Sequence, residues 1–187
     1  MANTDNPDGF RPVKTLSGAP VSGMVRAVTA GADDMFIGDP ISITGGVAVQ
    51  AAVEGIVAGV IVGFGGFDSE GNALGYNPND LEKKFFDTSA DTEADWSVWY
   101  VPADGVVFEA QFDDSEDVVI GEGYDLTVGD GSTTTGRSIF EIDGNAKTND
   151  GDVVVAEVPR GAKYDQTAGV ANKRVWVTFV NTMLGQI

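Results

Sequence analysis

Short runs of β-branched and aromatic residues recur along the whole chain, and glycine, aspartate or asparagine separates most runs from the next. Runs of this length, bounded by turn residues, predict strands. Many short strands with glycine-rich turns are typical of an antiparallel barrel or sandwich, so we expect a mainly β fold. The predicted strands are Met35–Ile37, Ile41–Thr44, Val47–Val53, Ile56–Phe64, Ser97–Val101, Val106–Phe112, Tyr124–Val128, Ser138–Ile142, Val153–Val158 and Lys173–Val180.

The most regular pattern lies in Val106–Phe112, where apolar residues occupy every second position and predict a half-buried strand. The dipeptide Glu54-Gly55 and the tripeptide Asp143-Gly-Asn predict turns. Pro78–Phe86 is the only helical candidate. It lies within residues 67–95, which are mostly polar and predict a long loop or insertion between two strands.

Residues 1–26 differ from the rest because they contain three prolines and three glycines. This spacing excludes a long helix or a central strand, and it predicts an extended N-terminal arm with single apolar anchors at Phe10, Val13 and Leu16. Such an arm buries too little apolar area to order itself alone. It is therefore either frayed or laid across another surface, for example a neighbouring subunit. Residues 27–187 are expected to form one β-rich body.

The 187 residues include no cysteine and no histidine. The chain therefore offers no disulfide, no thiolate, no imidazole general base and no histidine ligand for zinc or iron. These are the parts of the commonest hydrolase and metalloenzyme designs. We expect no enzymatic activity, no catalytic residues, no metal site and no cofactor. A hydrolase built on an Asp/Glu pair stays a further alternative, although no spacing in the sequence supports it.

The net charge of −18 is concentrated in the middle of the chain. Residues 1–26 carry +1 and residues 160–187 carry +3, which leaves −22 for the body. A body this acidic repels polyanions, so direct contact with nucleic acid or a membrane is not expected. The charge also keeps a concentrated or arrayed protein soluble, and a purely solvated surface explains it equally well.

Two motifs resemble catalytic or nucleotide-binding elements but lack the required context. Gly131-Ser-Thr-Thr-Thr-Gly136-Arg137-Ser138 has the glycine spacing of a phosphate-binding loop, yet a predicted strand follows it instead of a helix. We expect a polar hairpin loop there. Asp87-Thr88-Ser89 matches the tripeptide of aspartic proteases, but that chemistry needs two such aspartates and an enclosed pocket. Its acidic surroundings favour an exposed loop.

Two other groups of residues suggest ligand binding. The acidic residues of 113–117 and 91–95 could hold a divalent cation weakly, although neither run follows the calcium-loop pattern and a solvated face is the simpler interpretation. Trp96, Trp99, Tyr100 and Trp176 lie on predicted strands and could stack on a sugar. Aromatic residues on strands are more often core or interface residues.

Several short segments, taken in order, resemble a known class of protein. They are Asn3-Thr-Asp-Asn-Pro-Asp-Gly-Phe-Arg-Pro-Val, then Trp99-Tyr-Val followed by Val107-Phe-Glu-Ala-Gln, then Gly131-Ser-Thr-Thr-Thr-Gly-Arg-Ser, and finally Val-Pro-Arg followed by Lys-Arg-Val-Trp-Val. The order resembles that of the decoration, or cement, proteins of tailed bacteriophage capsids. The resemblance spans nearly the whole chain, and each motif alone has low specificity.

The resemblance implies a structural virion protein that is made in the host cytoplasm and stabilises the outer surface of the expanded shell. Its implied partners are the major capsid protein and further copies of itself, with a homotrimer favoured over a dimer. The arm would reach across neighbouring coat subunits through Phe10, Val13 and Leu16, together with Arg11, Lys14 and Arg26. The alternative, which rests on the tryptophans, is a carbohydrate-binding or adhesion module on a virion or cell surface.

Overall fold

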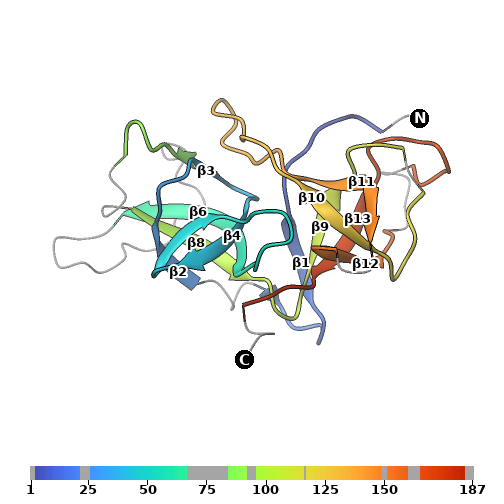
Figure 1. Cartoon of the computed structure of the whole chain (residues 1–187), viewed down its shortest axis with the longest axis horizontal. Helices are drawn as coiled ribbons and strands as arrows, with labels where there is room; N and C mark the ends of the chain where they lie inside the picture. The colour runs from blue at the N-terminus through green and yellow to red at the C-terminus, as the bar shows by residue number, and fades with distance from the viewer. Residues whose placement is uncertain are drawn as a thin grey trace.

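The computed structural model describes residues 3–21, 26–66, 84–91, 96–115, 117–148, 151–159 and 165–183. Nearly all of their regular structure is β-strand, as the sequence predicts. Two β units lie side by side in Figure 1, with a barrel on the left and a curled sheet on the right. No helix in the described residues is long and apolar enough to cross a membrane.

The first unit is a closed five-stranded barrel formed by the middle of the chain. Its strand order is β2-β5-β4-β6-β8, and β8 pairs back onto β2. Neighbouring strands are antiparallel except β2 and β5, which are parallel. The strands are β2 (Arg26–Ala30), β4 (Pro40–Thr44), β5 (Val47–Gln50), β6 (Gly59–Gly66) and β8 (Trp96–Pro102).

The first glycine of β6 lies very close to the neighbouring strand. A Cβ on Gly59 would lie 2.3 Å from the carbonyl oxygen of Val101 in β8. A larger residue would push the two strands apart. The buried side chains of Ile61, Phe64 and Val98 form the barrel core with residues from the other strands.

The second unit is a six-stranded antiparallel sheet with the order β1-β9-β13-β12-β10-β11. A bridge between Phe112 and Ile142 brings β11 back to the end of β9, so the sheet curls around an aromatic core. The strands are β1 (Arg11–Thr15), β9 (Val106–Gln111), β10 (Gly123–Thr127), β11 (Glu141–Thr148), β12 (Val153–Glu157) and β13 (Arg174–Phe179).

A small two-stranded ribbon caps the barrel on the side of the second unit's long loop. It consists of β3 (Met35–Phe36) and β7 (Phe85–Phe86), and the rings of Phe36 and Phe85 stack with centroids 5.1 Å apart. The loop of residues 131–138 reaches this ribbon from the second unit. It is held there by hydrogen bonds between Ile37 and the backbone of residues 136 and 138.

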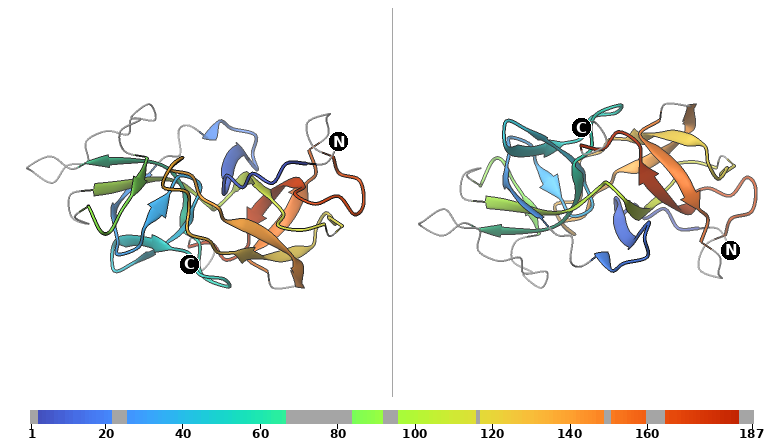
Figure 2. Two further views of the ribbon diagram at one scale, coloured as in Figure 1. Left: turned by 90° about the horizontal axis from the view of Figure 1, so that it is seen from above. Right: turned by 90° about the horizontal axis from the view of Figure 1, so that it is seen from below.

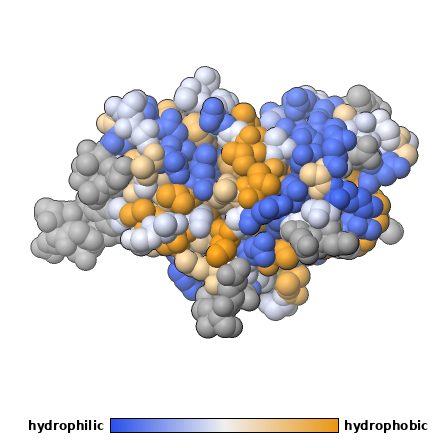
Figure 3. Space-filling model, in the orientation of Figure 1, coloured by the Kyte–Doolittle hydropathy of each residue, from blue (hydrophilic) through white to orange (hydrophobic). Residues whose placement is uncertain are grey.

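The two units meet along a seam formed by residues 51–58 of the barrel and residues 180–183 after β13. Val57 and Thr182 form a parallel bridge, and the amide of Val57 donates to the carbonyl of Asn181 at 2.7 Å. Figure 3 shows apolar surface gathered in the middle of this face, with hydrophilic surface on either side. The short turn between β8 and β9 links the barrel covalently to the second unit, as does the chain between β1 and β2.

Most predicted strands are confirmed, but several local predictions are wrong. The strand predicted at Ser138–Ile142 starts at Glu141 and continues through Asp143-Gly-Asn, which was expected to be a turn. Asp143 accepts hydrogen bonds from the amides of Asn145 and Ala146, and the pairing with β10 passes from Ile142 to Lys147, so the segment forms a turn-like bulge within β11. The helix predicted at Pro78–Phe86 is wrong at Phe85 and Phe86, which form strand β7, while residues 78–83 lie outside the described part of the chain.

The prediction that Val106–Phe112 is half-buried is also wrong, because every residue of β9 is buried. One face of β9 lies against the aromatic core, and its other face carries Val107, Glu109 and Gln111. The N-terminal arm contacts the polar residues of this second face, as described below. The covering segment comes from a distant part of the sequence, so the local pattern could not reveal it.

The N-terminal arm is an integral part of the second unit. Figure 2 shows it, in blue, running along this unit, and its strand β1 pairs antiparallel with β9. Phe10 is 1% exposed, its ring lies 5.1 Å from that of Phe179, and its amide donates to the carbonyl of Gly38. Of the two expected arrangements, the arm is laid across a surface, and this surface belongs to its own chain. The residues of the predicted insertion 67–95 are described only at 84–91.

Asp39 is a fully buried acid at the junction of the barrel with the ribbon and the long loop. Its Oδ2 atom accepts hydrogen bonds from the amide of Phe36 at 2.8 Å and from Nε2 of Gln50 at 3.1 Å. Burial raises the pKa of Asp39 to about 6, while hydrogen bonds from Ser138, Phe36 and Gln50 oppose this rise. Folding therefore disfavours the ionised form of Asp39 relative to the unfolded chain.

We expect Phe10→Ala to lower the free energy of unfolding by about 3–5 kcal/mol, because it leaves a cavity in the aromatic core. Leu16→Ala is the control, since Leu16 is 67% exposed, and it should change stability by less than about 0.5 kcal/mol. Urea unfolding measures both. Equal and small effects would show that the arm does not contribute to the core in solution.

We expect Asp39→Asn to stabilise the protein at pH 8 but not at pH 4. A folded-state pKa above the unfolded value favours folding below about pH 4, and this contribution is lost as the pH rises through about 6. A pKa shift of this size changes the free energy of unfolding by about 3 kcal/mol between the two ends of this pH range. Thermal unfolding of both proteins between pH 4 and pH 8 measures the difference. A variant that is less stable than the wild type at pH 8 would contradict the expectation.

Candidate partner-binding surface on the N-terminal arm

A buried ionic cluster fastens the arm to β9 and β13. The side chain of Glu109 is 7% exposed, and its Oε1 atom lies 2.6 Å from Nη2 of Arg11 and 3.8 Å from Nη1 of Arg174. Its Oε2 atom accepts a hydrogen bond from Nε1 of Trp176 at 3.2 Å. Arg174 also pairs with Asp8 at 3.2 Å. We call these five residues the arm clamp.

Hydrogen bonds extend this attachment towards the start of the chain. Nη2 of Arg174 donates to the carbonyl of Asn6 at 2.6 Å, and Nε2 of Gln111 donates to the carboxylate of Asp5 at 3.1 Å. The side-chain amide of Asn3 donates to the carbonyl of Asp165, and its Oδ1 atom accepts a hydrogen bond from the amide of Asp165. The arm is thus held along most of its described length before β1 begins.

Strand β1 presents a cation at the surface of the sheet. The ammonium group of Lys14 lies 2.7 Å from Oε2 of Glu157 in β12 and 4.6 Å from the centre of the Trp176 ring. It therefore combines an ion pair with a cation–π contact. Both charged side chains are about half exposed, so the ion pair itself adds little to stability.

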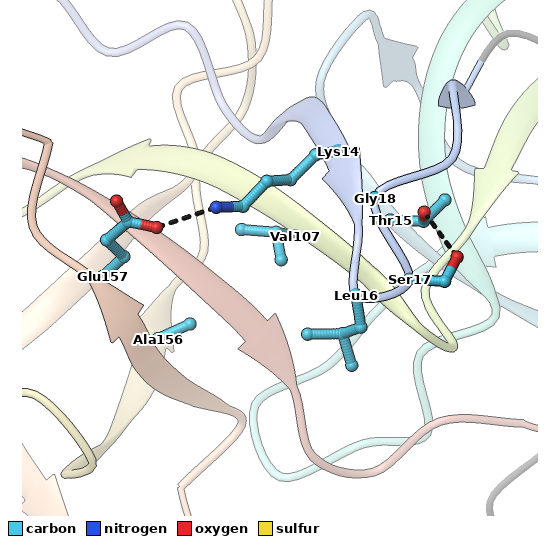
Figure 4. Close-up of a pocket in the computed structure, with 8 residues that line it drawn as sticks. All are labelled: Lys14, Thr15, Leu16, Ser17, Gly18, Val107, Ala156 and Glu157. Atoms are coloured by element: carbon cyan, nitrogen blue, oxygen red, sulfur yellow. Dashed lines mark hydrogen bonds and ion pairs between the residues drawn. The ribbon is translucent and has the colours of Figure 1, made fainter.

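A shallow groove of about 400 Å³ lies beside β1. In Figure 4, Lys14 and Leu16 lie on one side of the groove, Ala156 and Glu157 lie on the other, and Val107 lies between them. The groove therefore combines an apolar floor with one ion pair at its edge. It is too open and too poor in convergent polar groups to be an enclosed catalytic pocket.

The turn after β1 projects Leu16 into solvent. The hydroxyl of Thr15 donates to the carbonyl of Ala19 at 3.0 Å, and the amide of Gly18 donates to the carbonyl of Thr15. Gly18 has a φ of 81°, a conformation that favours glycine. Residues 16–20 are all exposed. We call residues 16–20 the arm tip, and Leu16 is its one large apolar side chain.

The six predicted contact residues have different environments. Lys14 and Leu16 lie together at the groove, while Val13 is half-buried in β1. Arg11 is about half exposed but is held by the arm clamp. Phe10 cannot anchor the arm on a partner in this fold because it already belongs to the core, and Arg26 lies on the barrel strand β2.

Sequence reasoning missed the rest of the arm clamp and Glu157. The signal for Glu109 was available, since a carboxylate within an otherwise apolar strand needs a cationic partner when it is buried. The identity of that partner was not available. Arg174 lies 65 positions further along the chain and becomes a neighbour only through the pairing of β13 with β9.

The two catalytic-like motifs have structural roles. Residues 131–138 form the expected polar hairpin loop, because the amide of Ser132 donates to the carbonyl of Arg137 and that of Gly136 donates to the carbonyl of Ser132. The carboxylate of Asp87 accepts hydrogen bonds from the amide and hydroxyl of Ser89, which closes a local turn. The amide and the hydroxyl of Thr88 in this turn bind Asp34.

The described acidic and aromatic candidates do not form one site, and residues 92–95 and 116 of the two acidic runs lie outside the described part of the chain. Asp113 accepts hydrogen bonds from Thr127 and Gly144, and no set of three acidic side chains in the described residues is arranged to hold a metal ion. Trp99 on the barrel donates to Ser97, and the ring of Trp176 on the sheet is covered by Lys14. These two tryptophans therefore belong to different units.

Comparisons with protein-family models, with curated proteins and with solved structures found no match to this chain.

We expect Glu109→Ala to lower the free energy of unfolding by about 3 kcal/mol, because it leaves the buried guanidinium of Arg174 with less negative charge around it. Arg11→Ala is the matched control, since the side chain of Arg11 is 55% exposed and its loss should cost less than about 1 kcal/mol. Urea unfolding measures both. Similar losses for the two variants would contradict a clamp centred on Glu109.

Proposed function

We propose that this protein is a non-enzymatic structural protein that binds the outer surface of a tailed-bacteriophage capsid and stabilises the expanded shell. The order of short motifs along the chain supports this function, as does the mainly β architecture with an extended N-terminal segment. Its partners in this proposal are the major capsid protein and further copies of itself, with a trimer favoured.

The observation that carries the proposal is the exposed Leu16 on a firmly attached arm. Leu16 is 67% exposed, the highest value among the large apolar side chains in the described residues. The arm clamp holds the preceding residues in one conformation, so little conformational entropy is lost when the tip binds a partner. Lys14, which is about half exposed and paired with Glu157, lies at the same groove as Leu16.

Binding through so small a tip is sufficient on a shell. Each contact contributes a modest free energy, but copies bound as an oligomer engage several coat subunits at once. The acidic body then faces solvent and keeps decorated particles apart. The carbohydrate-binding alternative has less support, because Trp176 lies in a different unit from the three aromatic residues of β8 and its ring is covered by Lys14.

The test uses capsids of the encoding phage from which this protein has been stripped. We expect Leu16→Asp to reduce capsid occupancy at least tenfold while the melting temperature of the free protein stays within about 2 °C, because Leu16 makes few contacts within the protein. Removing the whole arm would be uninformative, since it would also remove Phe10 and β1.

Val128→Asp is the matched control, because Val128 is 46% exposed and lies on a different loop. It should bind capsids like the wild type. Occupancy is measured by sedimentation of the particles followed by quantitative gel analysis. Unchanged occupancy of the Leu16→Asp variant would exclude the arm tip as the contact, and failure of the wild type to bind would exclude the function.

A further inference from the structure

A second exposed apolar patch lies on the seam, away from the β1 groove. Val53, Ile56, Val180 and Met183 are each 40–47% exposed, and we call them the seam patch. They come from two segments more than 120 positions apart. Backbone hydrogen bonds between Val57 and residues 181 and 183 bring the two segments together.

The backbone holds the two segments of the seam patch in a fixed arrangement. Val57 and Thr182 are paired and buried, and the amide of Met183 donates to the carbonyl of Val57 at 3.2 Å. Ile56 and Met183 are the direct chain neighbours of this buried pair, and both are exposed.

Two exposed carboxylates and one buried carboxylate lie next to the segments of the seam patch. Asp104 receives a hydrogen bond from the hydroxyl of Thr182, and Glu54 lies next to Val53. Asp152 is 1% exposed, its backbone carbonyl binds the amide of Val180, and its Oδ1 atom has no hydrogen-bond partner.

The charges near Asp152 repel one another. Burial raises the pKa of Asp152, and the negative charges of Asp125 and Glu54 raise it further, while hydrogen bonds from the amides of Leu126 and Glu54 oppose this. No basic side chain is among the causes of this shift. A cation brought to the exposed carboxylate of Glu54 would lower this repulsion.

We propose that the seam patch is a second docking surface, which binds a protein segment that presents apolar side chains next to lysine or arginine. Such a segment would bury its apolar side chains against the apolar centre of the patch. Its lysine or arginine side chains would face the acidic residues at the edge. A metal ion fits less well, because the acidic side chains of the described residues do not converge on one point. The docking surface itself does not depend on the proposed function. Only the identification of the partner as a capsid subunit rests on it.

The first experiment needs no capsid. Its probe is a fluorescein-labelled peptide of alternating leucine and lysine, compared with a leucine–glutamine peptide of the same length by fluorescence anisotropy. We expect the wild type to bind the lysine peptide at least tenfold more tightly than the glutamine peptide. This preference should fall sharply between 20 and 500 mM salt, because the Debye screening length falls from about 20 Å to about 4 Å over this range.

The double variant Ile56→Ser/Met183→Ser should bind the lysine peptide at least tenfold more weakly than the wild type. Ile120→Ser is the control, because Ile120 is 62% exposed but lies outside the seam patch, and it should stay within twofold. Glu54→Gln should weaken binding several-fold and reduce its salt dependence. Equal affinities of the wild type and the double variant would overturn the proposal.

The second experiment separates this proposal from the capsid function. A photo-crosslinking amino acid is placed at position 56 or at position 120, and each protein is irradiated on stripped capsids. Cross-links to the coat from position 56 alone support both proposals. Capsid binding without a cross-link from position 56 overturns the seam patch but keeps the function. Peptide binding at the patch without capsid binding overturns the function but keeps the patch.

Discussion

The ion pair between Glu109 and Arg174 is the constraint on which the arrangement of the second unit depends. Both side chains are at least nine-tenths buried, so each needs the opposite charge of the other. Their pairing requires β13 to lie beside β9 in one register, with Trp176 opposite Glu109. The same carboxylate then binds Arg11 and brings β1 to the free edge of β9. One buried charge thus determines how three segments of the chain meet.

This use of the arm changes which residues are available to a partner. Phe10 contributes to the core, and Arg11 neutralises Glu109, so neither offers a free anchor. What is left for recognition is the arm tip with Leu16 and, on our further proposal, the seam patch. Both are apolar side chains held on a rigid backbone in an acidic surface. Such sites suit a repeated assembly, where each contact is small and the number of contacts supplies the affinity.

The architecture could be predicted from the sequence more fully than the site. Strands such as Val106–Phe112 and Lys173–Val180 were recognisable because a strand's pattern is local and repeats every two residues. The arm strand β1 was missed because its two-fold pattern is interrupted by Pro12 and a bulge before Lys14. In the candidate site, Lys14 and Leu16 were predicted as contacts. Glu157 and Trp176 were not, since nothing local to them indicates that they face the arm.

The sequence by itself determined the class of fold and the chemistry that the chain lacks. Turn residues between short β-forming runs require many strands, and the absence of cysteine and histidine is a fact of composition. Only the tertiary structure decided where the arm lies and which apolar residues stay exposed. Phe10 and Leu16 look alike in the sequence, yet one is in the core and the other in solvent. The reason is physical: burial depends on which distant strand covers a residue, and strand pairing is decided by the whole fold.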